Sequence, residues 1–255
     1  MADSPASGST QRAWFLRCAA DEVADRAVLV GDRGRVEKAA TLLDNPQVLN
    51  QDRGLTAVTG EYRGRAVTVA AFGMGAPIAG VVLHELAMLG VQRFLRLGTV
   101  LGIGGTSLGS LVLADGAVRH ESTSGTYLPL PYPAIADHEM NTALRSTLAA
   151  GSRPWTAGLI ASYDGFYTEM FAAEPERADE VRARMDELGR YGVKAVDMET
   201  SAVLVVARAV GARAASLCLA SVDGLSQAKL TDGRTEAELE LLVTGLDSLA
   251  SLQDV

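Results

Sequence analysis

Two arginines, a glycine turn and a threonine stand where short apolar segments of the chain end, and together they could hold an anion. Gly31 and Arg35 lie at a junction between an expected strand and an expected helix. Arg96 lies inside an apolar strand, and Thr99 follows it. Backbone N–H groups at a helix start and guanidinium forks are donors that suit phosphate oxygens. The spacing alone leaves a second interpretation open, in which Arg35 makes a surface salt bridge and Arg96 pairs with a structural carboxylate.

Acidic side chains follow two further expected strands. Asp197, Met198 and Glu199 lie between a strand and an apolar helix, and Asp223 follows the last predicted strand. Ligands of open α/β sheets bind at the carboxyl ends of the strands, so these groups are candidates for the same site. The alternatives are that Glu199 only complements the start of its helix, and that Asp223 forms a turn with Gly224.

Several enzyme classes lack their sequence signature here. No GxGxxG follows a strand, and neither GxxxxGK[ST] nor HExxH occurs, which leaves dinucleotide-binding domains, P-loop NTPases and zinc hydrolases without support. Cys18 and Cys218 have no CxxC spacing and no nearby histidine. We therefore predict neither a disulfide framework nor a Cys/His zinc site, and we interpret Cys218 as a small buried hydrophobe.

The charge balance and the apolar stretches restrict the partners. With 23 Lys and Arg against 31 Asp and Glu, the formal charge is −8, opposite in sign to a duplex nucleic-acid binder. The uncharged stretches 66–83 and 97–114 are interrupted by glycines or proline, so neither would form an isolated membrane span. The first residues lack a secretion signal. We expect a cytoplasmic protein with no nucleic-acid and no membrane partner.

The elements that position these side chains alternate between strands and helices. This alternation predicts an α/β fold: a single domain with a central mixed β-sheet flanked by helices. Residues 1–12 are predicted to be a disordered tail and residues 13–255 the domain. The predicted strands are 27–30, 55–59, 66–72, 93–97, 110–114, 117–119, 158–162, 194–198 and 213–220. The predicted helices are 35–43, 73–89, 137–150, 174–189, one ending near 211, and 236–252.

Five segments, in order and at compatible spacing, resemble the nucleoside phosphorylases, the family that includes uridine phosphorylase and bacterial purine nucleoside phosphorylase. The likeness covers nearly the whole chain, from about Phe15 to Gly224. The segments are LVGDRGRVEKAATLLD (29–44), FGMGAPIAGVVLHELAMLGVQRFLRLGT (72–99), YPAIAD (132–137), ASYDGFYTEM (161–170) and AVDMETSAV (195–203).

The resemblance implies an enzyme that cleaves the N-glycosidic bond of a nucleoside with inorganic phosphate as co-substrate and without a metal or an organic cofactor. It also implies a homohexamer built of dimers. It implies phosphate-binding roles for Gly31, Arg35, Arg96 and Thr99, and for Arg53 acting on a neighbouring subunit. It also implies ribose-binding roles for Met198 and Glu199, base-binding roles for Phe166, Asp197 and Asp223, and catalytic roles for Arg96 and Asp223.

Base specificity is where the sequence departs from uridine phosphorylases, which carry a GQxR arrangement shortly after the Phe-Tyr pair. Here Phe166-Tyr167 is followed by Thr168 and Glu169, without that Gln and Arg. Losing both donors weakens recognition of a pyrimidine edge. Purine enzymes of the family place an acid after the last core strand to protonate N7, and Asp223 is the candidate, although Val222 replaces the usual serine. We therefore predict a purine nucleoside, and such an acid would need a raised pKa.

Two further departures concern the loop after the first strand and the N-terminal segment. Arg33 stands where the family usually has proline, and we expect it to face solvent. Phe15 stands where relatives carry a histidine near the 5′-hydroxyl, so it either lines a pocket for a modified 5′-end or packs at a subunit contact. The alternatives to a purine enzyme are a uridine phosphorylase with an altered base pocket, a nucleosidase, and an inactive nucleoside-binding homologue.

Overall fold

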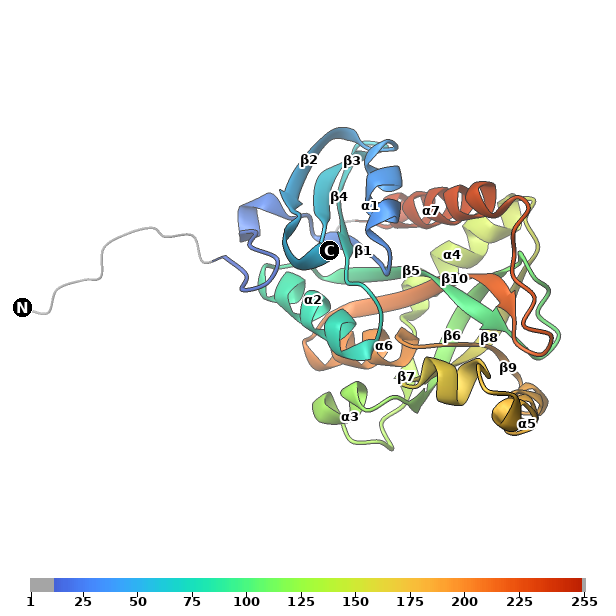
Figure 1. The fold of residues 1–255 in the computed structure, drawn as a ribbon. Coiled ribbons are helices and arrows are strands. Elements are labelled where there is room, and N and C mark those ends of the chain that lie inside the picture. The colour runs from blue at the N-terminus through green and yellow to red at the C-terminus, as the bar shows by residue number, and fades with distance from the viewer. Residues whose placement is uncertain (1–11, 254–255) are drawn as a thin grey trace, which may run out of the picture.

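The computed structural model of the protein describes residues 12–253, and these form a ten-stranded mixed sheet with helices on both faces (Figure 1). The predicted α/β class is confirmed. The strands are β1 (Arg26–Val30), β2 (Asp44–Asn50), β3 (Ala57–Tyr62), β4 (Arg65–Ala71), β5 (Arg93–Gly102), β6 (Leu111–His120), β7 (Ala134–Ile135), β8 (Trp155–Tyr163), β9 (Val193–Asp197) and β10 (Arg213–Asp223).

The sheet closes on itself in one half and stays open in the other. Strand β10 is parallel to β5 and antiparallel to β6, and β6 continues through β8 and β9 back to β5. Strands β1, β4, β3 and β2 extend from β5 as the open part. The two long strands β5 and β10 therefore run through the centre of the molecule, with β1 and β9 beside β5.

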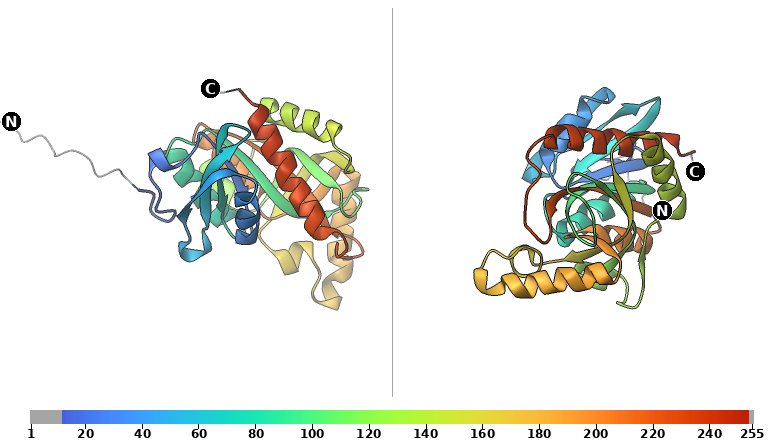
Figure 2. Two further views of the ribbon diagram at one scale, coloured as in Figure 1. Left: turned by 90° about the horizontal axis from the view of Figure 1, so that it is seen from above. Right: turned by 90° about the vertical axis from the view of Figure 1, so that its right-hand side faces the viewer.

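Helices cover both faces of the sheet. Seen from above, α7 crosses one face next to α4 (Figure 2), while α2 and α6 pack together on the other face. The helices are α1 (Arg33–Ala40), α2 (Ala76–Met88), α3 (Thr123–Tyr127), α4 (His138–Ala150), α5 (Ala178–Arg190), α6 (Thr200–Ala209) and α7 (Arg234–Ser251), with a single π-helical turn at Phe166–Met170.

Strand β1 shows how the core is divided between the two faces. Val28 belongs to the apolar cluster that contains Leu241 of α7, whereas Leu29 belongs to the cluster that contains Val203 of α6. Every residue of β1 is buried. A parallel strand that is covered on both faces has a continuous apolar sequence rather than an alternating one, which explains why the short run AVLV was recognisable as a strand.

The structure differs clearly from the predicted elements at four strands. β5 and β10 continue past residues 97 and 220, and residues 111–120 form the single strand β6 where two strands were predicted. Strand β2 was not predicted: it pairs only with β3, its first five residues are exposed, and it contains Pro46. An exposed edge strand tolerates proline and carries no apolar pattern, so the sequence offered no signal for it.

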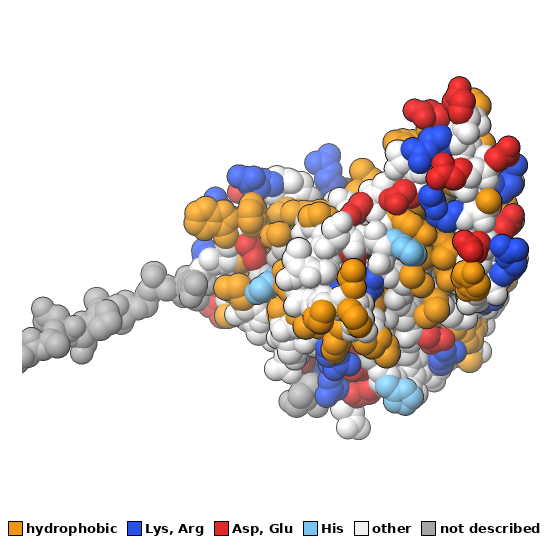
Figure 3. All heavy atoms as spheres, turned by 90° about the horizontal axis from the view of Figure 1, so that it is seen from below, with side chains coloured by type: hydrophobic (Ala, Val, Ile, Leu, Met, Phe, Trp, Pro, Cys, Tyr) orange, Lys and Arg blue, Asp and Glu red, His pale blue; other side chains and the backbone are white. Residues whose placement is uncertain are grey.

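Helix α5 carries many charged side chains on its surface. Positive and negative side chains alternate along it at the upper right of Figure 3, and Arg182 and Arg184 pair with Asp179 and Glu180 on the same helix.

In the described part of the chain no helix is long and apolar enough to cross a membrane. Residues 1–11 of the predicted tail lie outside the described residues, and Arg12 is held by the carboxylate of Glu22.

Candidate active site

A cavity of about 600 Å³ lies where the β1–α1 junction, β5, the β9–α6 junction and the end of β10 meet. It brings together eight of the residues predicted from the sequence: Gly31, Arg35, Arg96, Thr99, Phe166, Asp197, Met198 and Glu199. The remaining lining residues are Asp32, Gly73, Met74, Gly98, Val100, Leu101, Met170, Val196, Ser221, Val222, Lys229 and Arg234.

Arg96 is the buried cation at the centre of this cavity, with only 3% of its surface exposed. Its Nη2 lies 2.6 Å from Glu199 Oε2 and 3.2 Å from Asp197 Oδ2. Its Nη1 donates to the sulfur of Cys218 at 2.6 Å, so Cys218 is a contact of the site and not simply a buried hydrophobe. Burial alone would lower the pKa of Arg96, but Cys218, Asp197 and Glu199 raise it above its ordinary value. Arg96 is therefore a permanent cation.

Glu199 links this cation to the start of α2. Its Oε2 accepts from Arg96, and its Oε1 accepts from the backbone N–H of Gly75 at 2.7 Å. Gly75 has a φ angle of +98°, a backbone conformation that residues other than glycine rarely adopt. The loop before α2 can therefore turn its N–H toward the carboxylate. Both Glu199 oxygens are fixed in position while they keep lone pairs for a further donor.

Asp197 lines the cavity, and protein donors occupy its carboxylate. The carboxylate accepts from Ser162 Oγ at 2.6 Å and from the backbone and hydroxyl of Thr200, in addition to its ion pair with Arg96. The base-binding role predicted from the sequence stays a prediction. A carboxylate occupied by two hydroxyls, an N–H group and a guanidinium orients Arg96 and caps α6, and it has little capacity left for a ligand.

Arg35 is the second buried cation, and its donors are less fully used. Its Nη1 donates to the carbonyl of Leu97 at 3.2 Å. For its buried Nε, and for that of Arg96, the described residues supply no acceptor. Burial lowers the pKa of Arg35, and the charge of Arg96 lowers it further despite Glu238 and Asp32. Two cations that repel each other and retain free donors are stabilised by an anion between them.

Close backbone approach fixes this arrangement at two glycines. A Cβ at Gly31 would lie 2.9 Å from the carbonyl oxygen of Gly73, and a Cβ at Gly98 would lie 2.6 Å from Cζ of Arg96. The guanidinium of Arg96 therefore folds over Gly98, where only hydrogen leaves room for it. Arg33, the first residue of α1, is exposed and does not line the cavity, as expected.

Substituting Gly98 by alanine should displace the Arg96 guanidinium from Glu199. We expect kcat/KM of the enzyme to fall by about 10²-fold, since displacing a positioned catalytic group by about 1 Å has an effect of that size. Steady-state kinetics would measure it. Gly125→Ala is the matched control, because a Cβ at Gly125 meets its nearest neighbour only at 3.9 Å. Unchanged kinetics for Gly98→Ala would contradict the position assigned to Arg96.

Arg53 and Phe15 contact each other away from this cavity. The guanidinium of Arg53 lies 5.5 Å from the ring centroid of Phe15, and neither residue lines the cavity of the same protomer. The backbone N–H of Phe15 donates to the carboxylate of Glu85. In a single protomer, then, Arg53 does not reach the predicted phosphate site and Phe15 does not line the cavity where the sugar is expected.

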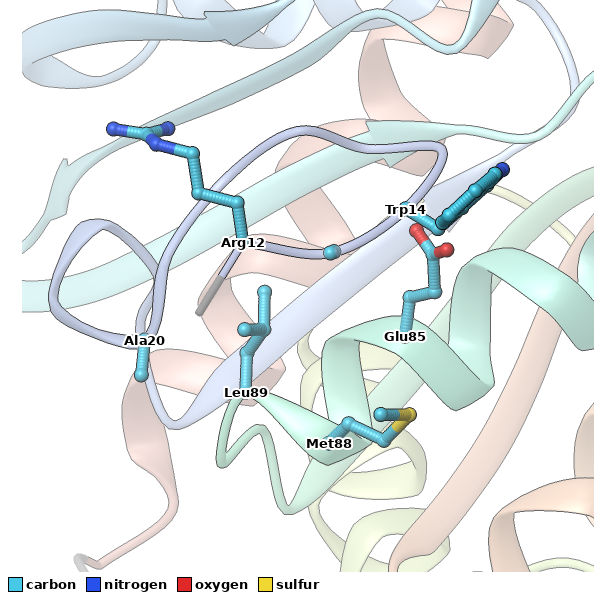
Figure 4. A pocket seen from close by; sticks show the side chains of 7 residues that line it. Arg12, Trp14, Ala20, Glu85, Met88 and Leu89 are labelled. Carbon is cyan, nitrogen blue, oxygen red and sulfur yellow. The ribbon is translucent and has the colours of Figure 1, made fainter. Parts of the chain in front are cut away.

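A second cavity, of about 450 Å³, lies beside this N-terminal segment (Figure 4). It is lined by Arg12, Ala13, Trp14, Ala20, Glu85, Met88 and Leu89. Its two charged groups already have partners: Arg12 pairs with Glu22, and Glu85 accepts from the backbone of Phe15 and Leu16. Of these two cavities the first is the candidate active site, because its buried arginines keep donors without a protein acceptor.

Asp223 is not among the lining residues of that cavity. Its Oδ1 accepts from the backbone N–H groups of Leu225 and Ser226 and from the Ser226 hydroxyl, at 3.2, 2.7 and 2.8 Å. The backbone hydrogen bond from Ser226 holds the pKa of Asp223 below its ordinary value. A proton donor to N7 needs a raised pKa, so that role stays a prediction that would require Asp223 to leave its turn.

The hydrogen bonds of Asp223 indicate that it stabilises its own turn, and substitution can test this role. Asp223→Asn keeps Oδ1 and should change kcat/KM for inosine by less than about threefold. Asp223→Ala loses the three hydrogen bonds that Oδ1 accepts. We expect it to lower kcat/KM for inosine by about tenfold, because the turn becomes disordered. Purine cleavage that is lost in Asp223→Asn while uridine cleavage persists would instead establish Asp223 as the proton donor.

The site residues that reasoning from the sequence missed include Gly75, Ser162, Ser221, Lys229 and Arg234. Gly75 lies in the Gly73–Pro77 turn, whose glycine pair was a visible signal of close backbone approach. Lys229 and Arg234 follow the last core strand, at the sheet edge where ligands bind, so their position could have marked them. Ser162 is an unremarkable residue inside a strand, and no local pattern distinguishes it.

Comparisons with known proteins agree with the family that the sequence resembles. Residues 25–244 match the family described as the Phosphorylase superfamily. Guanosine phosphorylase of Halorubrum lacusprofundi is 33% identical over 204 residues, covering 80% of this chain and 79% of that protein. Uridine phosphorylase of Escherichia coli is 33% identical over 192 residues, covering 74% and 76%.

A solved structure shows the same architecture. The crystal structure of uridine phosphorylase from Vibrio fischeri superposes with a TM-score of 0.86 at 26% identity, covering 96% of this chain and 99% of that one. The sequence match and the shared fold agree over nearly the whole length. The chain therefore belongs to the phosphorylase superfamily and is a nucleoside phosphorylase, a pentosyltransferase.

Proposed function

We propose that this protein cleaves purine nucleosides with inorganic phosphate, releasing the free base and ribose 1-phosphate. The observation that carries the proposal is the pair of buried arginines, Arg35 and Arg96, in one cavity with the carboxylate of Glu199. A nucleosidase, which uses water, gains nothing from two buried cations with free donors. The 33% identity to a guanosine phosphorylase adds support for a purine substrate.

Phosphate is the nucleophile in this proposal, and the chain supplies its binding site. Arg35 and Arg96 provide guanidinium donors, Thr99 a hydroxyl, and Gly31 a backbone that approaches closely beside the start of α1. Donors fixed before the reaction hold the nucleophile near the anomeric carbon without reorganisation. The charge of the bound phosphate then stabilises the cationic sugar that develops as the glycosidic bond breaks.

Glu199 and Met198 hold the ribose. Glu199 is anchored by Arg96 and Gly75, and a carboxylate so fixed can accept hydrogen bonds from the 2′- and 3′-hydroxyls. Met198 lines the cavity beside it and contributes apolar contact. Orienting the sugar in this way presents its anomeric carbon to the phosphate between the arginines.

The far end of the cavity is apolar and would hold the base. Phe166, Met170, Leu101, Val196 and Val222 line it and belong to one apolar cluster. This composition suits the broad face of a purine. Uridine phosphorylase activity is the second candidate, favoured by the overall superposition on the Vibrio fischeri enzyme.

The proposed enzyme works as an oligomer, a hexamer built of dimers, in the cytoplasm. Arg53 and Phe15 lie together outside their own protomer's cavity, and two apolar residues near them, Trp14 and Met88, are 76% and 69% exposed. Exposed apolar surface of this kind marks an interface. A neighbouring subunit brought there would add Arg53 to the phosphate site and Phe15 to the sugar's 5′-end.

Chromatographic product analysis tests the proposed function. Inosine, guanosine, adenosine and uridine are each incubated with the enzyme, with and without phosphate. We expect hypoxanthine and guanine to appear only when phosphate is present. Uracil as the fastest product would favour the second candidate, and base release without phosphate would show that water is the nucleophile.

A further inference from the structure

We propose that Lys229 selects the base, by donating a hydrogen bond from its ammonium group to a carbonyl oxygen on the edge of the base remote from the sugar. The site would then accept oxo-bases such as hypoxanthine, guanine and uracil, and disfavour the amino-bases adenine and cytosine. This inference rests on the proposed nucleoside phosphorolysis and specifies the substrate class of that same site.

The chain holds Lys229 against the apolar end of the cavity. The segment between β10 and α7, at the right of Figure 1, folds back on β10. Lys229 forms an antiparallel bridge with Val222, and the neighbouring N–H of Leu230 donates to the carbonyl of Ser221 at 2.9 Å. Lys229, Val222 and Ser221 all line the cavity. The turn capped by Asp223 closes this hairpin and so fixes the backbone of Lys229.

Two stacked aromatic side chains lie between Lys229 and the apolar end of the cavity. Nζ of Lys229 lies 6.0 Å from the centroid of the Phe171 ring. That ring stacks on Phe166, with centroids 5.5 Å apart and planes inclined by 13°. Phe166 lines the apolar end of the cavity, where the base is proposed to lie. Since Lys229 and Phe166 line the same cavity, a ligand that packs against Phe166 shares that cavity with the ammonium group.

Two cations of the segment after β10 line the cavity, Lys229 and Arg234, and Arg234 already donates to Glu238 at 3.0 Å. The carboxylate of Glu169 accepts from the backbone N–H of Gly165 at 2.9 Å, and Glu169 does not line the cavity. Among the described residues no carboxylate lies within ion-pair distance of Lys229. Its charge is thus free for a ligand. Ser221 is the other polar side chain on this strand that lines the cavity, and it carries no charge.

The preference for oxo-bases follows from the hydrogen-bonding capacity of an ammonium group. Lys229 has three donors and no acceptor, so a base carbonyl can accept from it, whereas an exocyclic amino group presents only further donors. An ammonium group that donates to an oxo-base is left without an acceptor when an amino-base binds. A site of this kind distinguishes the two bases by about 10²-fold or more. The leaving base also gains negative charge on that oxygen as the glycosidic bond breaks, so the ammonium group stabilises the transition state.

The test compares Lys229→Met with Lys229→Arg and with Lys194→Met. Lys194 is a lysine on β9 that does not line the cavity and donates to the carbonyl of Gly104. For Lys229→Met, we expect kcat/KM for inosine to fall by about 10- to 10²-fold while that for adenosine stays within about twofold. Lys229→Arg, which keeps a donor-only cation, should preserve the preference for inosine, and Lys194→Met should match the unmodified enzyme.

Equilibrium binding of free bases gives a readout that does not depend on turnover. With phosphate present, calorimetry should show hypoxanthine binding more tightly than adenine, and uracil more tightly than cytosine. Lys229→Met should abolish both differences. Equal affinities in the unmodified enzyme, or differences that survive in Lys229→Met, would overturn the role of Lys229 even if nucleosides are cleaved. Absence of any cleavage would overturn the proposed function, while the binding comparison would still decide the role of Lys229.

Discussion

Replacing Arg96 with glutamine is expected to lower kcat/KM by about 10³-fold, the upper range for loss of one transition-state donor. The guanidinium lies between the carboxylates of Glu199 and Asp197, at 2.6 and 3.2 Å. Without it, two like charges face each other in a buried site, and the phosphate loses a cation. Removal of one partner from a buried ion pair also lowers the free energy of unfolding by about 3–5 kcal/mol. Phosphate-dependent kinetics and thermal unfolding measure the two effects.

A matched control separates stability from catalysis. Arg93 lies at the other end of β5, is also buried, and faces Asp25 with Nη1 3.7 Å from Oδ2. Arg93→Gln should lower the melting temperature while leaving the KM for phosphate within about twofold of its original value. If Arg96→Gln and Arg93→Gln changed kinetics and stability in the same proportion, Arg96 would be a structural residue and the phosphate site would lie elsewhere.

Replacing Glu199 with glutamine should lower kcat/KM for ribonucleosides by about 10²-fold, comparable to the loss of a strong positioned hydrogen bond in a buried site. Both protein partners of the carboxylate are donors, namely the N–H of Gly75 and the guanidinium of Arg96. A glutamine offers one oxygen and one NH₂ group, so one of these donors would face another donor. The ribose hydroxyls would lose their acceptor at the same time.

A double-mutant cycle can isolate the ribose contact. If Glu199 accepts from the 2′-hydroxyl, a 2′-deoxynucleoside should lose less activity on Glu199→Gln than the matching ribonucleoside does. Glu121→Gln is the control, because Glu121 is also buried and accepts two hydrogen bonds, from Ser124 and Ser201, without lining the cavity. Equal losses for both sugars would show that Glu199 acts only through Arg96.

The electrostatics of the cavity reconcile the two interpretations that the sequence left open. Arg96 does pair with a carboxylate, as the structural interpretation held, but it pairs with two, and one of these is the proposed ribose ligand. The cation therefore both neutralises buried carboxylates and faces the cavity. A buried arginine of this kind is held in one geometry by its partners, which is what a preorganised anion site requires.

Much of the fold was predictable because its signals are local. Buried parallel strands such as β1 and the core of β10 are continuous apolar runs, and the helices begin and end near glycine, proline or aspartate. Asp137, for example, caps α4 by accepting from the N–H of Met140 at 3.1 Å, a pattern written in the sequence itself. The exposed edge strand β2 and the π-helical turn at Phe166–Met170 carried no such signal.

The sequence by itself determined which chemical groups the site can use and which ends of strands they occupy. Arg35, Arg96, Thr99 and Glu199 were recognisable because their residue types and their places beside apolar segments do not depend on distant parts of the chain. The resemblance of ordered segments to the nucleoside phosphorylases identified the family for the same reason.

Only the tertiary structure decided which of these groups meet. Arg96 contacts Cys218, which is 122 residues away in the chain, and Glu199, which is 103 residues away. Asp197 pairs with Arg96, Asp223 accepts from its own turn, and Lys229 folds back beside Val222. Each outcome depends on how strands pack and on which donors burial leaves without a partner. These are properties of the whole sheet, since a side chain's type states what it can bind but not what lies within its reach.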